Sequence, residues 1–198
     1  MNQSQQRRYD INPNLMNLIL AAMFLAVGII LPFFTGQIPQ IGSMLLPMHL
    51  PALLCGLICG WQYGLSVGFI LPLLRYALFG MPPIFPTGIA MAFELAAYGA
   101  IAGFLYNHSR WQCLLSLYRS LIIAMIGGRI VWGLVQAVIM GISGDVFTWQ
   151  LFIAGAFLNA ILGIVLQLVF IPAIMIALDR TGVVRFSRKR PADLPARR

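Results

Sequence analysis

The sequence predicts an all-α integral membrane protein with six transmembrane helices. Hydrophobic residues make up 60% of the 198 residues and charged residues only 9%, whereas a typical soluble domain carries roughly 25% charged residues. The hydrophobic residues form long continuous runs rather than the alternation of barrel strands. Helices satisfy every backbone hydrogen bond internally, as lipid requires. The composition therefore predicts an integral membrane protein, and the long hydrophobic runs predict that its spans are helices.

The hydrophobic runs divide the chain into six expected spans, most of which reach the ~20 residues that cross a bilayer. They cover residues 15–34, 46–60, 62–79, 86–106, 118–140 and 149–178. The second span is short and contains Pro47 and Pro51, and the last is long. The chain is thus expected to have three parts: residues 1–14, a cytoplasmic N-terminal segment; 15–178, the membrane domain; and 179–198, a basic cytoplasmic tail.

The basic residues predict the orientation of these spans. Arg7 and Arg8 precede the first span, the 107–118 loop carries Arg110, and seven Arg or Lys residues follow from Arg180 onward. The 35–45 loop has no charge. Because basic loops stay in the cytoplasm, both termini of this multi-pass membrane protein are predicted to be inside. The tail fits anionic lipid, and without a basic domain no nucleic acid is expected.

Small residues recur at spacings that allow helices to pack closely in a membrane. Ala22 and Ala26 lie on one face of the first span, and Gly56, Gly64 and Gly68 lie around the turn between the second and third. For most of these residues the expected role is packing inside the bundle.

Three ionisable residues, Arg75, Glu94 and Arg129, lie inside the hydrophobic spans. A charge at this depth costs several kcal/mol unless it is paired or faces a polar cavity. The expected orientation places Arg75 near the outer surface, Glu94 about 12 Å below it and Arg129 near the membrane centre. Trp132 and Gln136 follow Arg129 on one helix face. Together with Asn159 on the last span and His49 at the outer start of the second, these residues predict a polar chamber that opens outward.

The sequence leaves alternative roles open for these charges. Glu94 and Arg129 either line the chamber and contact a ligand, or pair with each other and only fix helix packing. Arg75 would then have no partner, which favours an anionic ligand group such as a carboxylate, unless its side chain extends to the lipid headgroups. His49 either contacts a ligand or is a satisfied residue at a helix end.

Several motifs of other function classes are absent. The single lysine, Lys189, is not part of a Gly-Lys-Ser/Thr phosphate loop, so the chain does not hydrolyse ATP by that route. There is no His-Glu-x-x-His zinc motif and no Gly-x-Ser-x-Gly nucleophile motif. Cys55 and Cys59 are read as core residues. We therefore expect no metal, no cofactor and no catalysis.

The middle of the chain resembles a known family. The relevant segments are Leu45-Leu46-Pro47-Met48-His49-Leu50-Pro51, Cys55-Gly56, Gly60-x-x-Tyr63-Gly64, Pro72-Leu73-Leu74-Arg75, Phe79-Gly80-Met81-Pro82-Pro83-Ile84-Phe85-Pro86-Thr87 and Ala92-Phe93-Glu94. Together they resemble the substrate-binding subunit (S component) of an energy-coupling factor (ECF) vitamin transporter, over most of residues 15–178.

The resemblance implies capture of a vitamin from outside, with a transmembrane coupling protein and two cytoplasmic ATPase subunits as partners. It also implies that Ala22 and Ala26 dock onto the coupling protein. The sequence is most similar to the pantothenate branch, and a carboxylate- and hydroxyl-bearing ligand agrees with Arg75, Arg129, Gln136 and Asn159. Folate-like, flavin and ribazole-type ligands remain alternatives.

Two functions from other classes also remain open. One is an intramembrane enzyme with Glu94 and His49 as acid and base, although no nucleophile or metal cluster is visible at matched depth. The other is an ion-coupled carrier that works alone, in which Glu94 takes up a proton.

Overall fold

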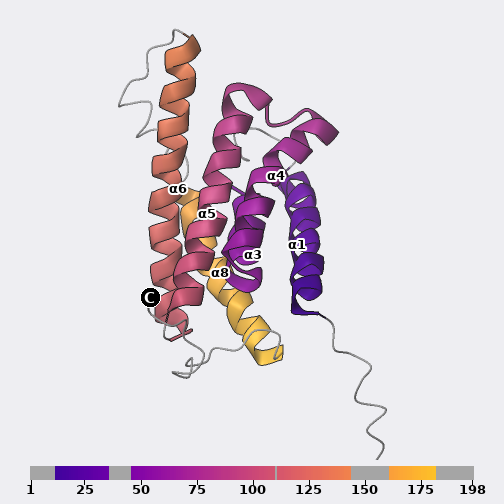
Figure 1. Cartoon of the computed structure of the whole chain (residues 1–198), viewed down its shortest axis with the longest axis vertical. Coiled ribbons are helices and arrows are strands. Elements are labelled where there is room, and N and C mark those ends of the chain that lie inside the picture. Colours follow the sequence, from indigo (N-terminus) through magenta and orange to yellow (C-terminus); the bar gives the residue numbers. More distant parts are fainter. Residues whose placement is uncertain (1–11, 36–45, 110, 144–160, 182–198) are drawn as a thin grey trace, which may run out of the picture.

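Helices form the described part of this chain, which in the computed structural model comprises residues 12–35, 46–109, 111–143 and 161–181. The elements are α1 (Pro13–Ile30), the 3₁₀ turn η2 (Leu31–Thr35), α3 (His49–Cys59), α4 (Trp61–Phe79), the π turn η3 (Ile84–Gly88), α5 (Ile89–His108), α6 (Leu114–Ser143) and α8 (Ile161–Thr181). The long helices run side by side as a bundle (Figure 1), and α5 packs against α3, α4 and α6.

In the described part of the chain, each of the six expected ranges contains or overlaps one α-helix. Among the described residues, four segments are long and apolar enough to cross a membrane: Asn14–Phe34, Ile84–His108, Leu114–Ile142 and Ile161–Arg180. The 46–60 range instead holds the 11-residue helix α3, about 16 Å long, which is shorter than the hydrocarbon layer. Crossing by α3 and α4, and the orientation of the bundle, stay predictions. Residues 149–160 of the last expected span lie outside the described residues.

The ends of several helices follow from local sequence. Asn12 caps α1, and its side-chain oxygen accepts a hydrogen bond of 3.1 Å from the backbone N–H of Asn14. Pro13 occupies the first turn, where a missing N–H costs nothing. Gly60 separates α3 from α4 with φ +103°, and Gly80 ends α4 with φ +69°. Both angles lie in the region that only glycine adopts readily.

Glycines allow α3, α4 and α5 to approach until their backbones touch. A Cβ atom at Gly99 of α5 would meet the carbonyl oxygen of Gly64 in α4, and one at Gly56 of α3 would meet that of Gly99. A Cβ at Gly68 would meet the carbonyl oxygen of Leu95. The predicted close packing at Gly56, Gly64 and Gly68 is confirmed, and it fixes the relative positions of α3, α4 and α5, the helices that carry His49, Arg75 and Glu94.

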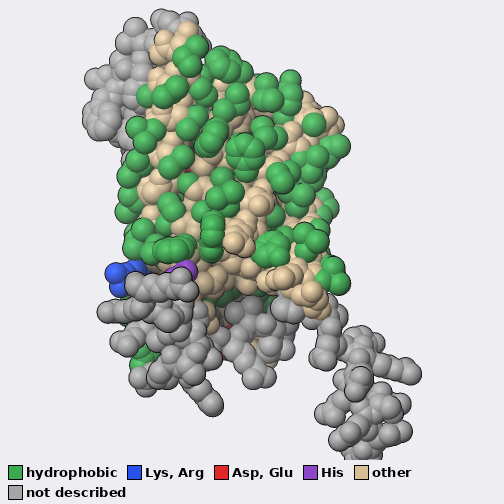
Figure 2. Space-filling model, in the orientation of Figure 1, with side chains coloured by type: hydrophobic (Ala, Val, Ile, Leu, Met, Phe, Trp, Pro, Cys, Tyr) green, Lys and Arg blue, Asp and Glu red, His purple; other side chains and the backbone are tan. Residues whose placement is uncertain are grey.

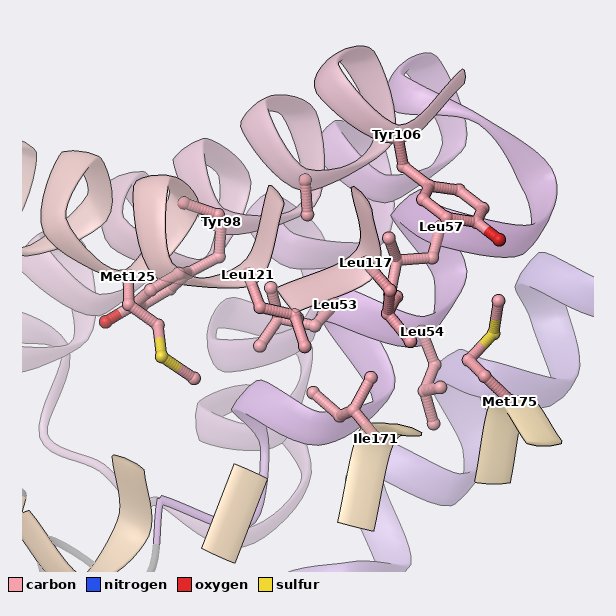
Figure 3. Packing of buried hydrophobic residues seen from close by; sticks show 12 residues of the cluster. Leu53, Leu54, Leu57, Tyr98, Tyr106, Leu117, Leu121, Met125, Ile171 and Met175 are labelled. Carbon is pink, nitrogen blue, oxygen red and sulfur yellow. The ribbon is translucent and has the colours of Figure 1, made fainter. Parts of the chain in front are cut away.

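The main hydrophobic core lies between α3, α5, α6 and α8 (Figure 3). Leu53 and Leu57 of α3 meet Leu117 and Leu121 of α6 there, and Ile171 of α8 closes the cluster. In contrast, the outer surface of the bundle is covered by hydrophobic side chains (Figure 2). A water-soluble protein does not expose a continuous apolar surface of this size, so the surface indicates contact with lipid.

Candidate functional site

Three helices bring His49, Glu94 and Arg129 together inside the bundle. Glu94 lies on the buried face of α5 that also carries Tyr98 four residues later. Arg129 Nη1 lies 2.9 Å from Glu94 Oε1, and His49 Nε2 lies 3.5 Å from the same oxygen. The three residues are only 1%, 1% and 4% exposed in the order His49, Glu94 and Arg129. We call these residues the charged cluster.

The aromatic ring of Tyr98 completes this cluster. It meets the ring of His49 edge to face, with 5.2 Å between the ring centroids. Sequence reasoning missed Tyr98, although its position one turn after Glu94 on the same helix face was a usable signal. The ring covers one side of His49 and so limits where another group can approach the imidazole.

The polar atoms of the charged cluster have few hydrogen-bond partners among the described residues. The Arg129–Glu94 contact is an ion pair by distance, but its angles leave Glu94 Oε1 without an aligned hydrogen bond. Two nitrogens of Arg129, Nε and Nη2, are buried and have no hydrogen-bond partner among the described residues. The same holds for both ring nitrogens of His49, although Nε2 lies near Glu94. Such groups are rare, and each costs about 1–3 kcal/mol.

The orientation of Arg129 is chemically specific. Nη1 faces Glu94, whereas Nε and Nη2 lie on a different edge of the planar guanidinium group. The N–H groups of that edge point in parallel, which is the arrangement that binds both oxygens of a carboxylate. Arg129 can therefore hold Glu94 and a second planar anion at the same time.

Two glutamines extend the polar region. Gln136 lies two helical turns after Arg129 in α6, and its buried Oε1 has no partner among the described residues. Gln167 of α8 is 1% exposed, and its Nε2 is likewise without a partner in the described part of the chain. Trp132 is half-buried in α6. Asn159 lies outside the described residues, so its predicted place in the site is not tested.

The expectation that Arg75 would lack a partner is wrong. Arg75 Nη1 donates a 2.8 Å hydrogen bond to the carbonyl oxygen of Ile29, in the last turn of α1. The guanidinium carbon also lies 5.5 Å and 5.7 Å from the ring centroids of Phe33 and Phe79. The C-terminal end of a helix carries unpaired carbonyl groups and partial negative charge. Arg75 neutralises that end and is itself only 4% exposed.

The remaining residues singled out from the sequence lie away from the charged cluster. Ala22 and Ala26 are exposed on the outer surface of α1, as a docking face requires. Cys55 and Cys59 are buried beside Ala21 and Val67 in a small hydrophobic cluster. Among the described residues, no group of three or more His, Cys, Asp or Glu side chains is placed to hold a metal ion.

The comparisons with known proteins agree with this picture. A family model described as "ECF transporter, substrate-specific component" matches residues 16–178. A search of curated proteins and a search of solved structures each found no match. The matched range covers more than half of the chain and contains all the helices of the bundle except their outermost residues. The chain therefore belongs to the family of substrate-specific components of ECF transporters.

Proposed function

We propose that this chain captures a small carboxylate-bearing vitamin at the charged cluster, with pantothenate as the best-fitting type. The observation that carries the proposal is the second edge of Arg129, whose Nε and Nη2 are buried without partners among the described residues. Glu94 already holds the first edge. A substrate carboxylate on the second edge would supply the two missing acceptors through charge-assisted hydrogen bonds.

The other polar atoms around the cluster favour a substrate that has hydroxyl or amide groups. Gln167 Nε2 is a donor and Gln136 Oε1 is an acceptor. His49 supplies one donor and one acceptor in its neutral form. A carboxylate attached to a chain of hydroxyl and amide groups would satisfy both kinds. Folate-like ligands share the carboxylate, whereas flavin and ribazole-type ligands lack it and would leave the second edge of Arg129 without a charged acceptor.

Arg75, Trp132 and Asn159 are proposed as further substrate contacts. Arg75 keeps additional N–H groups beyond the one bound to Ile29. Its role can be distinguished from that of Arg129, because Arg75 is tied to the end of α1. If Arg75 acts only by positioning that end, Arg75→Lys should restore most of the affinity lost in Arg75→Ala.

The proposal includes partners and location. Import would require a transmembrane coupling protein and two cytoplasmic ATPase subunits, and Ala22 and Ala26 would form part of the docking face on α1. Their exposure supports this, because small exposed residues let a second helix approach closely. The protein would lie in the bacterial cytoplasmic membrane with both termini inside, bordered by lipid elsewhere.

Calorimetry of the purified protein with a panel of vitamins, without ATP, tests the proposal. We expect one carboxylate-bearing vitamin to bind tightly, and Arg129→Gln to weaken that binding about tenfold or more, because charge-assisted bonds contribute ~1.5–3 kcal/mol. Arg180→Gln is the matched control, since Arg180 is exposed at the end of α8. Absence of binding to every member of the panel would contradict the function.

A further inference from the structure

A groove lies between the end of α5 and the beginning of α6, with a volume of about 570 Å³. Its apolar lining includes Leu105, Leu115 and Ile123, and its polar lining includes His108, Ser116 and Arg119. It opens at the end of the bundle where α1 begins and α8 ends (Figure 1). The groove is separate from the charged cluster, since no residue of that cluster lines it.

The surroundings of the groove place it at a membrane–water boundary. Leu115 is 80% exposed and Trp111 is 54% exposed, and tryptophan is enriched at the level of lipid headgroups. Histidine and basic side chains meet at the lower border of the hydrophobic surface (Figure 2). An occupant would therefore have a polar portion beside Arg119 and an apolar portion beside Ile123, one turn further into α6.

The charge of the groove selects an anion. Its lining contains Arg119 but neither Asp nor Glu, and no ion pair to Arg119 is found among the described residues. The ring of His108 stacks on Phe104 at 4.2 Å, and its Nδ1 lies 2.9 Å from the Phe104 carbonyl oxygen. In the tautomer with a proton on Nδ1 this is a hydrogen bond, which holds the ring in place at the groove.

We propose that this groove binds an anionic phospholipid, with the phosphate on Arg119 and an acyl chain along Ile123, which lies one turn further into α6 on the same face. Anionic headgroups attract basic residues at the cytoplasmic surface by about 1 kcal/mol for each Lys or Arg. The groove adds shape to that attraction, because its lining combines apolar and polar side chains. The lipid would fix the connection between α5 and α6, the two helices that carry Glu94 and Arg129.

Native mass spectrometry of the purified full chain tests the proposal. The protein is mixed with phosphatidylglycerol or with phosphatidylcholine of the same acyl chains. We expect the anionic lipid to be retained several-fold more often, Arg119→Gln to remove the difference, and Arg180→Gln to preserve it. Equal retention of the two lipids, or an unchanged preference in Arg119→Gln, would overturn the proposal.

A fluorescence measurement covers the case in which Arg119→Gln fails to fold. Phosphatidylglycerol with brominated acyl chains should quench the fluorescence of Trp111. The part of the quenching that is lost in Trp111→Phe is the part that comes from Trp111. Brominated phosphatidylcholine should quench Trp111 less. Inorganic phosphate, added in excess, should leave the quenching unchanged. If phosphate removes it, the groove holds a free anion and the lipid assignment is wrong.

Discussion

The ion pair between Glu94 and Arg129 allows a stability prediction that separates folding from binding. Both side chains are at most 5% exposed, and Arg129 Nη1 lies 2.9 Å from Glu94 Oε1. Removing one partner of such a pair leaves a buried, unpaired charge and costs about 3–5 kcal/mol. Replacing both by uncharged residues of similar size is often neutral. The pair should therefore show strong coupling in a double-mutant cycle.

We expect Glu94→Gln and Arg129→Met each to lower the melting temperature in detergent by roughly 6–20 °C, since 1 kcal/mol corresponds to about 2–4 °C for a chain of this size. The double variant should melt within a few degrees of the wild type. It should nevertheless fail to bind the vitamin, because the proposed carboxylate site on Arg129 is gone. The double variant would thus regain thermal stability without regaining vitamin binding.

The assay is thermal unfolding of the purified variants in one detergent, followed by calorimetry at a temperature where all of them are folded. Arg180→Gln controls for the loss of an exposed positive charge at the end of α8. Single substitutions that cost less than about 1 kcal/mol would refute the reasoning, because that is the range of a solvated surface pair. A double variant as unstable as the sum of the singles would also refute it.

Two further predictions follow from the structure. Gly99→Ala should destabilise the protein strongly, because its Cβ would meet the Gly64 backbone, whereas Gly141→Ala meets no atom within 4 Å and should be neutral or slightly stabilising in a melting experiment. Finally, Cys113 is half-buried whereas the other two cysteines are buried, so Cys113 is the cysteine that a maleimide should label. Because the 107–118 loop is predicted to be cytoplasmic, an impermeant maleimide should label Cys113 in inverted membrane vesicles but not in intact cells. Labelling in intact cells would reverse the predicted orientation.

Much of the helical architecture could be predicted from the sequence, because a long apolar run in lipid has few alternatives to a helix. The range 62–79 became α4 (Trp61–Phe79), and 118–140 became the longer α6 (Leu114–Ser143). The boundaries were less certain at the second span. There the hydrophobicity continues to Leu46, but the helix begins at His49, after the residues Leu46 to Met48.

The candidate site could be predicted only in part. A buried Glu94 and a buried Arg129 need partners, and the pairing between them was one of the alternatives that the sequence left open. The sequence did not contain the information that places Arg75 against the end of α1. That assignment depends on the rotation of α4 and on the position of the α1 carbonyl groups, which come from packing.

The sequence by itself determined that the chain is helical and membrane-embedded and that charged side chains lie within its spans. These properties depend on composition and on the length of hydrophobic runs. The tertiary structure decided which charges meet: Glu94 contacts Arg129 and His49, and Arg75 contacts Ile29. The physical reason is the glycine contacts between α3, α4 and α5, which fix helix rotation, and a rotation of one residue would turn each charged group toward a different neighbour.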